Sequence, residues 1–287
     1  MVDVKPLHPD FGAEIGGVDI TCQLSKAEWG PIRAAFEEYS ILLFRGQAMD
    51  DDTQITFSER FGPLERTISA NPAGGTAFAR QSNIDINDGT VIPPDDRRML
   101  YQKANMLWHT DSSFKPVPSL CSVLSARQVP STGGNTEFVS CRAAWERLPV
   151  SKQKQLEGLV VVHDLVYSRG LVDPTVLTTA QKAEVSTVRQ ALVRTNPANG
   201  RKALFIGAHA SHIEGMPLEE GRALLAELLE VASPPEAILS HEWQGGDVIV
   251  WDNRCVLHRA TPYDSLKFRR LMQRTTIAGD GPTVAAV

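Results

Sequence analysis

Apolar residues follow two different spacings in the first sixty residues of this chain. Residues 25–39 carry apolar side chains at helical spacing behind Ser25, a suitable N-cap, so this segment is expected to be a helix. The following run, SILLFRG, is short, apolar and ended by glycine, as in a buried strand. Helical spacing returns from Asp50 to Phe61.

Short apolar runs dominate the rest of the chain, with two further helices among them. Strands are expected at SLCSVLSARQV, after the turn in STGGNTEF, and at DVIVWDN, CVLHRA and LMQRTTIAG. Helices are expected at 142–158, around Pro149, and at 217–232. Short strands with helices gathered at the front and middle predict a mainly β fold with α decoration, a double-stranded β-helix (jelly roll).

Residues 68–104 are the least regular part, and INDGTVIPPDD supplies turn chemistry there. A long irregular segment inside a compact domain is often a lid or a binding loop. We therefore expect an active-site lid within 68–104. The sequence contains no repeat, low-complexity tract or obvious linker, which favours one domain over residues 1–287.

Composition narrows the class of protein. A hydrophobic fraction of 42%, a charged fraction of 22% and a net charge of −5 are typical of a globular protein with a substantial core. No block of Lys and Arg offers a surface for phosphates, so we expect no nucleic-acid partner. No apolar run approaches the roughly 20 residues that cross a bilayer, so no membrane role is expected and the cytoplasm is the default location. The four scattered cysteines are expected to be buried free thiols.

Three side chains form a candidate metal site: His109 and Asp111 in WHTDSSF, and His258 in WDNRCVLHRA. Two neutral imidazoles and a carboxylate can hold three positions of an Fe(II) octahedron and leave three positions for other ligands. Alternate residues on an extended segment share a face, so one segment could present both His109 and Asp111. Zn²⁺ accepts the same ligands, and composition does not separate the two metals.

Arg270 and Arg274 in RRLMQRTTI are candidate anion-binding residues. On a strand they would face the same side about 13 Å apart, which suits two different anions better than one. A guanidinium binds a carboxylate through two parallel hydrogen bonds, which lysine does not reproduce. Thr136 in GGNTEF is a candidate hydroxyl donor to a cosubstrate, and His209 in FIGAHASHIEG is a candidate hydrogen-bonding residue near the substrate.

The chain resembles the Fe(II)/2-oxoglutarate-dependent dioxygenases of the taurine dioxygenase superfamily, and within it the branch that cleaves 2,4-dichlorophenoxyacetate and other aryloxyalkanoates. The resemblance runs from ILLFRGQ through NMLWHTDSSF and GGNTEF to WDNRCVLHR, and the FIGAHASH stretch is shared closely with the phenoxyacetate enzymes. It implies a jelly roll with iron at one mouth. Fe(II), 2-oxoglutarate and O2 are the implied cofactor and cosubstrates.

The resemblance also implies a role for each matching residue. The implied iron ligands are His109, Asp111 and His258. Arg270 and Thr136 match the binding site of the distal carboxylate of 2-oxoglutarate. Asn105 matches a residue near cosubstrate and substrate, and Arg274 matches the residue that binds the acidic group of the substrate. The interval from His258 to Arg270 is one residue longer than is common in relatives, so Arg269 is the alternative to Arg270.

The implied reaction is hydroxylation of the carbon next to the ether oxygen of a small anionic aromatic substrate. The products would be a phenol, glyoxylate or another 2-oxo acid, succinate and CO2. The alternative is a taurine, alkylsulfonate or alkyl sulfate dioxygenase with the same cofactors. A different class, a cupin-like binding protein without turnover, is disfavoured by the intact ligand triad. Relatives assemble as oligomers, so a homo-oligomer is expected.

Overall fold

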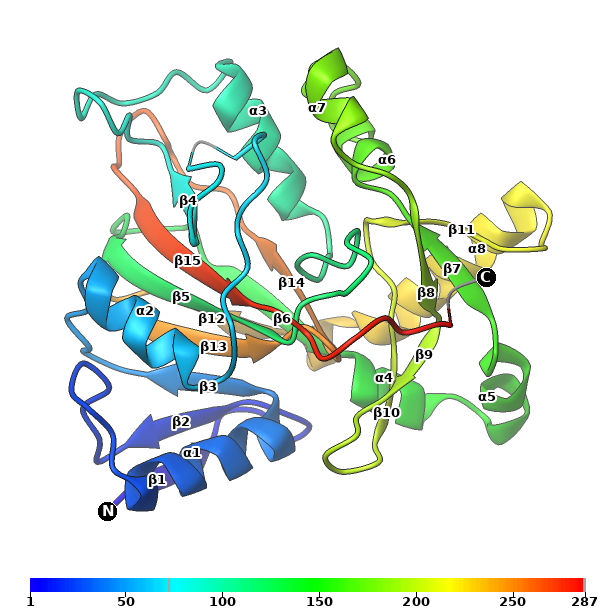
Figure 1. Ribbon diagram of the computed structural model, residues 1–287, viewed down its shortest axis with the longest axis horizontal. Coiled ribbons are helices and arrows are strands. Elements are labelled where there is room, and N and C mark those ends of the chain that lie inside the picture. The colour runs from blue at the N-terminus through cyan, green and yellow to red at the C-terminus, as the bar shows by residue number, and fades with distance from the viewer. Residues whose placement is uncertain (72, 286–287) are drawn as a thin grey trace.

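A computed structural model describes residues 1–71 and 73–285. Residue 72 of the predicted lid and the last two residues of the predicted domain therefore lie outside the described residues. The fold is mostly β-sheet with helices around it (Figure 1). Within the described residues, no helix combines the length and the apolar character needed to span a membrane.

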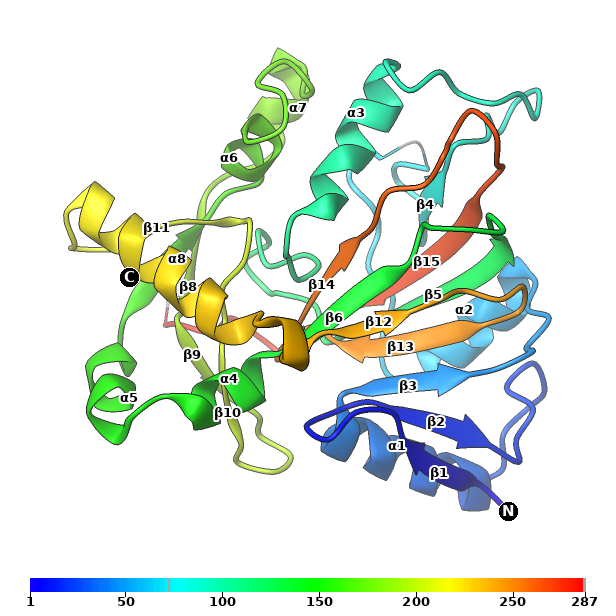
Figure 2. The same cartoon turned by 180° about the vertical axis from the view of Figure 1, so that it is seen from behind.

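The largest element is a seven-stranded sheet, in which only β2 and β3 pair in parallel. Its strands, in spatial order, are β1 (Asp3–Pro6), β2 (Ala13–Gly16), β3 (Ile41–Phe44), β13 (Val248–Asp252), β5 (Cys121–Gln128), β15 (Leu271–Ile277) and β4 (Phe78–Ser82). A smaller sheet consists of β12 (Leu239–His241), β6 (Thr136–Ser140) and β14 (Val256–Ala260). Figure 2 shows β6 and β12 in front of β13 and β5, so the two sheets face each other.

Strands β3 and β13 of the large sheet are buried on both faces, which explains why their sequences are apolar without alternation. In β3, Leu42 and Phe44 pack with the helices α1 (Lys26–Tyr39) and α2 (Asp51–Glu59), whereas Ile41 and Leu43 point into the core between the two sheets. Each of these side chains is at most 1% exposed. Full burial of such a side chain stabilises the fold by about 1.5–3 kcal/mol.

The chain between β6 and β12 forms a lateral layer of helices and short strands beside the two sheets (Figure 1). Its helices are α4 (Cys141–Arg147), α5 (Val150–Leu156), α6 (Leu165–Gly170), α7 (Thr179–Ala183), α8 (Leu218–Ala232) and the short 3-10 turn η2 (Pro235–Ala237). Its strands are β7 (Val160–His163), β8 (Val188–Ala191) and β11 (Ala210–Ile213) in one sheet, and β9 (Val193–Thr195) with β10 (Lys202–Leu204) in another. This layer supplies one wall of the candidate site.

Several elements agree with the sequence-based expectations. Helix α1 begins at the predicted N-cap, where Ser25 and Glu28 form a reciprocal capping box. Helix α2 and helix α8 lie within the predicted ranges, and the helical segment 142–158 is divided at Pro149 into α4 and α5. Proline lacks the amide hydrogen that a continuous helix needs, which explains the division.

Two expectations need correction. Residues 68–104 are not irregular throughout, because β4 pairs with β15 at the sheet edge and α3 (Arg97–Lys103) leads into the 3-10 turn η1 (Ala104–Met106). Both elements are short, and tertiary pairing rather than a local pattern stabilises β4. The cysteines are free, but only three are buried, since Cys22 is exposed on the surface.

Candidate metal centre and its two pockets

His109 and His258 are brought together by the backbone. The amide of His109 donates to the carbonyl of His258 over 3.1 Å, and the reverse bond measures 2.8 Å. This exchange of two hydrogen bonds aligns the imidazoles, whose ring centroids lie 4.2 Å apart. His258 belongs to β14, whereas His109 forms an isolated bridge after η1.

Asp111 completes the cluster from a turn and not from an extended strand. The turn begins at Asp111, two residues after the bridge, and Ser112 has a φ of 54°, yet His109 and Asp111 still present their side chains to one cluster. The single bridge ends there because the turn redirects the backbone. Ser122 on β5 fixes the carboxylate by donating its hydroxyl to Oδ2 over 2.7 Å. Arg274 on β15 donates Nη1–H to Oδ1 over 2.5 Å.

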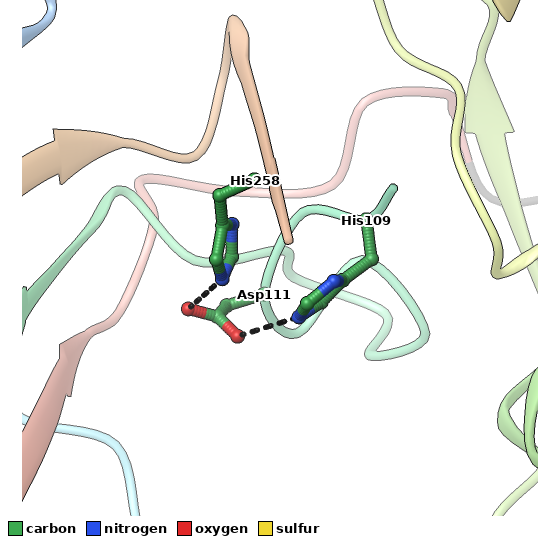
Figure 3. A group of neighbouring side chains, drawn as sticks. All are labelled: His109, Asp111 and His258. Atoms are coloured by element: carbon green, nitrogen blue, oxygen red, sulfur yellow. Dashed lines mark ion pairs between the residues drawn. The ribbon is translucent and has the colours of Figure 1, made fainter. Parts of the chain in front are cut away.

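The three side chains offer donor atoms to one point (Figure 3). Asp111 lies 4.0 Å from Nε2 of His109 through Oδ1 and 3.8 Å from Nε2 of His258 through Oδ2. All of the candidate donor atoms lie within 4.8 Å of one another, and the residues are buried. Two imidazoles and one carboxylate that converge in this way can hold a divalent metal ion.

The protonation states also fit a metal. Burial is the largest influence on His109 and lowers its pKa to about 4, against the attraction of Asp111. Burial and then His109 lower the pKa of His258 well below 6.5. Burial opposes ionisation of Asp111, but Arg274 and the imidazoles outweigh it and hold its pKa at about 2. At neutral pH the cluster therefore presents two neutral imidazoles and a carboxylate.

Neighbouring groups orient the first imidazole. Nδ1 of His109 lies 2.8 Å from the carbonyl oxygen of Leu107. A carbonyl only accepts, so Nδ1 carries the hydrogen and Nε2 keeps its lone pair for a metal. Nδ1 of His258 is buried and has no hydrogen-bond partner among the described residues. This donor set suits Fe(II) and Zn²⁺ alike.

A first pocket opens from the cluster between α3, β6 and the loop before β15. Its empty volume is about 1030 Å³, and its lining includes His109, His258, Thr136 and Arg270. Arg270 is buried, and burial lowers its pKa to about 10, so it stays positively charged at neutral pH. Among the described residues it has no carboxylate partner, and its Nη2 reaches only the carbonyl of Gly134 at 3.5 Å.

Arg270 is held in this pocket by the chain on either side of it. Its amide donates to Oδ1 of Asn83 over 2.7 Å, and the amide nitrogen of Asn83 ties down the loop that precedes β15. Gly133 has a φ of 73°, and a Cβ there would come within 2.7 Å of the carbonyl oxygen of Pro262. The glycine therefore lets the turn before β6 pack closely against this loop. Arg269 is exposed and donates to the carbonyl of Gly89, outside both pockets.

A second pocket lies on the other side of the cluster. Asn105, His109, Gln81 and Arg274 line both pockets, so the two meet at the candidate metal centre. The second pocket also includes His209, whose Nδ1 lies 2.8 Å from Oγ of Ser168. Burial, followed by the nearby charge of Arg169, lowers the pKa of His209 well below 6.5, so this imidazole is neutral.

The structure thus brings every candidate site residue from the sequence to one region. It also reveals residues that sequence patterns missed: Trp243, which donates its indole hydrogen to Thr136, and Arg169, which lines the second pocket. Trp243 lies between short strands and Arg169 ends a short helix, and neither has a spacing that marks a site. Only the tertiary contacts reveal them.

Comparison with known proteins gives a family and close relatives. The family described as taurine catabolism dioxygenase TauD, TfdA matches residues 3–276. The α-ketoglutarate-dependent 2,4-dichlorophenoxyacetate dioxygenase of Cupriavidus pinatubonensis is 44% identical over 281 residues, which cover 96% of this chain and 98% of the relative. The (S)-phenoxypropionate/α-ketoglutarate dioxygenase of Sphingobium herbicidovorans is 37% identical over 294 residues, which cover 99% and 98% of the two chains.

A solved structure has the same architecture. The crystal structure of AAD-2 in complex with Mn(II) and N-oxalylglycine superposes with a TM-score of 0.92 at 37% sequence identity. The match covers 100% of both chains. The likeness therefore extends over both sheets and the lateral layer.

Proposed function

We propose that this chain, which belongs to the TauD, TfdA family and is a 2-oxoglutarate (α-ketoglutarate)-dependent dioxygenase, acts on an aryloxyalkanoate such as 2,4-dichlorophenoxyacetate. Hydroxylation of the carbon beside the ether oxygen gives a hemiacetal, which collapses to a phenol and glyoxylate, while 2-oxoglutarate is converted to succinate and CO2. The 44% identity over nearly the whole chain to a dioxygenase with this substrate carries the proposal.

The proposed metal ligands are His109, Asp111 and His258. Fe(II) held by these residues, together with 2-oxoglutarate and O2, would supply the oxidising chemistry. The chain contributes two neutral imidazoles and an ionised carboxylate in a buried site. Arg274 and Ser122 keep the carboxylate oriented through their hydrogen bonds to its two oxygens.

Arg270 and Thr136 form the proposed site for the distal carboxylate of 2-oxoglutarate in the first pocket. A buried guanidinium without a counter-ion is matched by an anion that offers two acceptor atoms. The Thr136 hydroxyl accepts from Trp243 and so has its own hydrogen available for a carboxylate. Asn105 borders both pockets, where it would contact cosubstrate and substrate.

The proposed place for the primary substrate is the second pocket, with Arg274 and His209 on its walls. Tyr101 and Phe114 also line it, and their rings suit an aromatic substrate. The task of these residues is to hold one C–H bond toward the metal and to exclude water. Because His209 is neutral, it orients the substrate through hydrogen bonding or ring contact and not through charge.

The finer architecture belongs to the same proposal. The two facing sheets support a double-stranded β-helix, formed as one domain. Residues from 68–104, among them Gln81 and Met99, line the first pocket, which supports a lid role for this segment. Assembly into a homo-oligomer and location in the cytoplasm remain predictions from the sequence.

The test is a substrate panel with purified protein, Fe(II), 2-oxoglutarate and O2. Aryloxyacetates, aryloxypropionates, taurine and an alkyl sulfate would be compared by the release of phenol, sulfite and sulfate, with succinate as the common product. We expect phenol and succinate in equal amounts from the aryloxyalkanoates. Sulfite from taurine, or sulfate from the alkyl sulfate, without phenol from any aryloxyalkanoate would favour the alternative dioxygenase.

A further inference from the structure

The positive charges of the second pocket are unevenly compensated. Lys115 donates to a carboxylate oxygen of Glu65 over 2.6 Å, and Arg274 donates to Asp111 over 2.5 Å. Each of these two cations therefore already has a carboxylate partner. Arg66 is exposed, so water screens its charge. The remaining basic side chain of the pocket is Arg169.

Arg169 has no carboxylate partner among the described residues. It is only 7% exposed, and its Nη1 reaches two neutral oxygens, the Tyr101 carbonyl and Oδ1 of Asn105, both at 3.5 Å. Its Nε is buried and has no hydrogen-bond partner there. A buried cation with such weak compensation is costly to the folded protein, and an anion placed beside it relieves that cost.

The contacts of Arg169 suit a carboxylate. The guanidinium carbon lies over the Tyr101 ring, 4.2 Å from its centroid, in a cation–π contact. The side chain is thereby fixed before a ligand arrives, which reduces the entropy lost on binding. Its Nε–H has no partner among the described residues and its Nη1 has only two distant oxygens, so N–H groups are available for the two hydrogen bonds that a carboxylate accepts.

Arg169 therefore occupies in the second pocket the position that Arg270 occupies in the first: each is buried, and each lacks a carboxylate partner among the described residues. Two uncompensated guanidiniums on opposite sides of the candidate metal centre match two different anions. In the first pocket, the anion matched to Arg270 is the distal carboxylate of 2-oxoglutarate. In the second pocket, the anion matched to Arg169 is the acidic group of the primary substrate.

We propose that Arg169 is a substrate-binding residue that, together with Arg274, receives the carboxylate of the aryloxyalkanoate. This inference rests on the proposed function. Arg274 also holds Asp111, so Arg169 supplies the positive charge that is free to balance the substrate. Arg169 and Ser168, the partner of His209, are consecutive residues of α6, so this helix supplies the cation and also supports His209.

The experiment measures binding to the anaerobic protein loaded with Fe(II) and 2-oxoglutarate. The probes are 2,4-dichlorophenoxyacetate and its primary amide, which has nearly the same shape without the charge, and binding is followed by the change in the visible absorption band. The variants are Arg169→Gln and Arg169→Met, which both remove the charge. Arg222→Gln is the matched control, because Arg222 also lies over a tyrosine ring, that of Tyr167 at 5.2 Å, but lines neither pocket.

We expect Arg169→Gln to weaken binding of the acid at least about 30-fold, equivalent to about 2 kcal/mol, and binding of the amide less than about 3-fold. The affinity for 2-oxoglutarate and the Arg222→Gln control should stay unchanged. Equal losses for acid and amide, or an unchanged affinity for the acid, would overturn the role of Arg169.

Two further outcomes are also decisive. If Arg169→Gln loses its fold by circular dichroism, Arg169→Met, which also removes the charge, is used for the test, and an acid-to-amide preference equal to that of the unaltered protein would overturn the inference. If the unaltered protein neither binds the acid nor releases phenol in aerobic turnover, the proposed function fails and this inference fails with it. Acid binding that is retained in the unaltered protein and in Arg222→Gln but weakened in Arg169→Gln supports both.

Discussion

Trp243 donates its indole Nε1–H to Oγ1 of Thr136 over 2.9 Å, in the buried wall behind the first pocket. An indole nitrogen only donates, so the Thr136 hydroxyl must accept this bond and keeps its own hydrogen for another partner. His241 packs edge-on against the Trp243 ring with centroids 4.6 Å apart and fixes its position. Trp243 thus positions a hydroxyl for the proposed cosubstrate carboxylate.

Trp243→Phe should raise the KM for 2-oxoglutarate about 5-fold with a smaller change in kcat, because one hydrogen bond of about 1 kcal/mol is removed while an aromatic ring is kept at the position. Steady-state kinetics with 2-oxoglutarate as the varied substrate measure this split. Trp145→Phe is the control, since Trp145 is also buried but lines neither pocket. An unaltered KM in Trp243→Phe would remove the positioning role.

His109→Ala and His258→Ala should each lower the affinity for Fe(II) or Mn(II) more than about 100-fold and abolish turnover, because loss of even an outer-shell partner of a metal ligand costs 10–100-fold. Metal bound per chain and succinate release are the measurements, with circular dichroism to show a retained fold. His212→Ala is the control, since that imidazole bonds to Ser211 and lines neither pocket. Normal metal binding by either triad variant would refute the ligand set.

Arg270→Gln should raise the KM for 2-oxoglutarate at least about 30-fold, whereas Arg269→Gln should change it less than about 2-fold. The physical reason is that Arg270 is buried in the pocket wall, while Arg269 is exposed and bonded to a carbonyl outside it. The two neighbouring arginines form a matched pair for kinetics and for equilibrium binding of 2-oxoglutarate. A large increase in KM for Arg269→Gln and a small one for Arg270→Gln would instead assign the binding of 2-oxoglutarate to Arg269.

His163 gives a prediction for stability against pH. It is buried, stacked on Phe205 and bonded to Ser113, and burial lowers its pKa to about 3 from 6.5. The unfolded chain takes up this proton near pH 6.5 and the folded protein does so only near pH 3, so the unfolded state binds more protons between these values. Stability from the neutral imidazole is complete above pH 6.5 and is lost as pH falls toward 3.

His163→Gln should therefore lose about 2 kcal/mol less free energy of unfolding than the unaltered protein between pH 6 and pH 4.5. Urea denaturation of the metal-free protein at both pH values measures this difference. The comparison is between the changes with pH, since the substitution also alters packing at every pH. Parallel losses in the two proteins would show that His163 is not the group that titrates.

The local elements of the fold follow from the sequence because their causes are local. Ser25 and Glu28 are three residues apart and cap α1 whatever surrounds them, and the apolar run at β3 has a buried strand as its natural conformation. The pairing of β4 with β15 could not be predicted from the local sequence, because the stabilising partner lies far away in the chain. Local sequence therefore predicts that a strand or helix exists, whereas its place in a sheet depends on partners far away in the chain.

For the site, the sequence by itself determined the ligand types, two histidines and one aspartate within recognisable motifs, and the resemblance that goes with them. Tertiary structure decided how they meet: Asp111 reaches the cluster from a turn, and the backbone exchange between His109 and His258 aligns the imidazoles. It also decided which arginines face a pocket and have no carboxylate partner within residues 1–71 and 73–285, Arg169 and Arg270. Burial and charge compensation depend on residues that the folded chain brings together from distant positions.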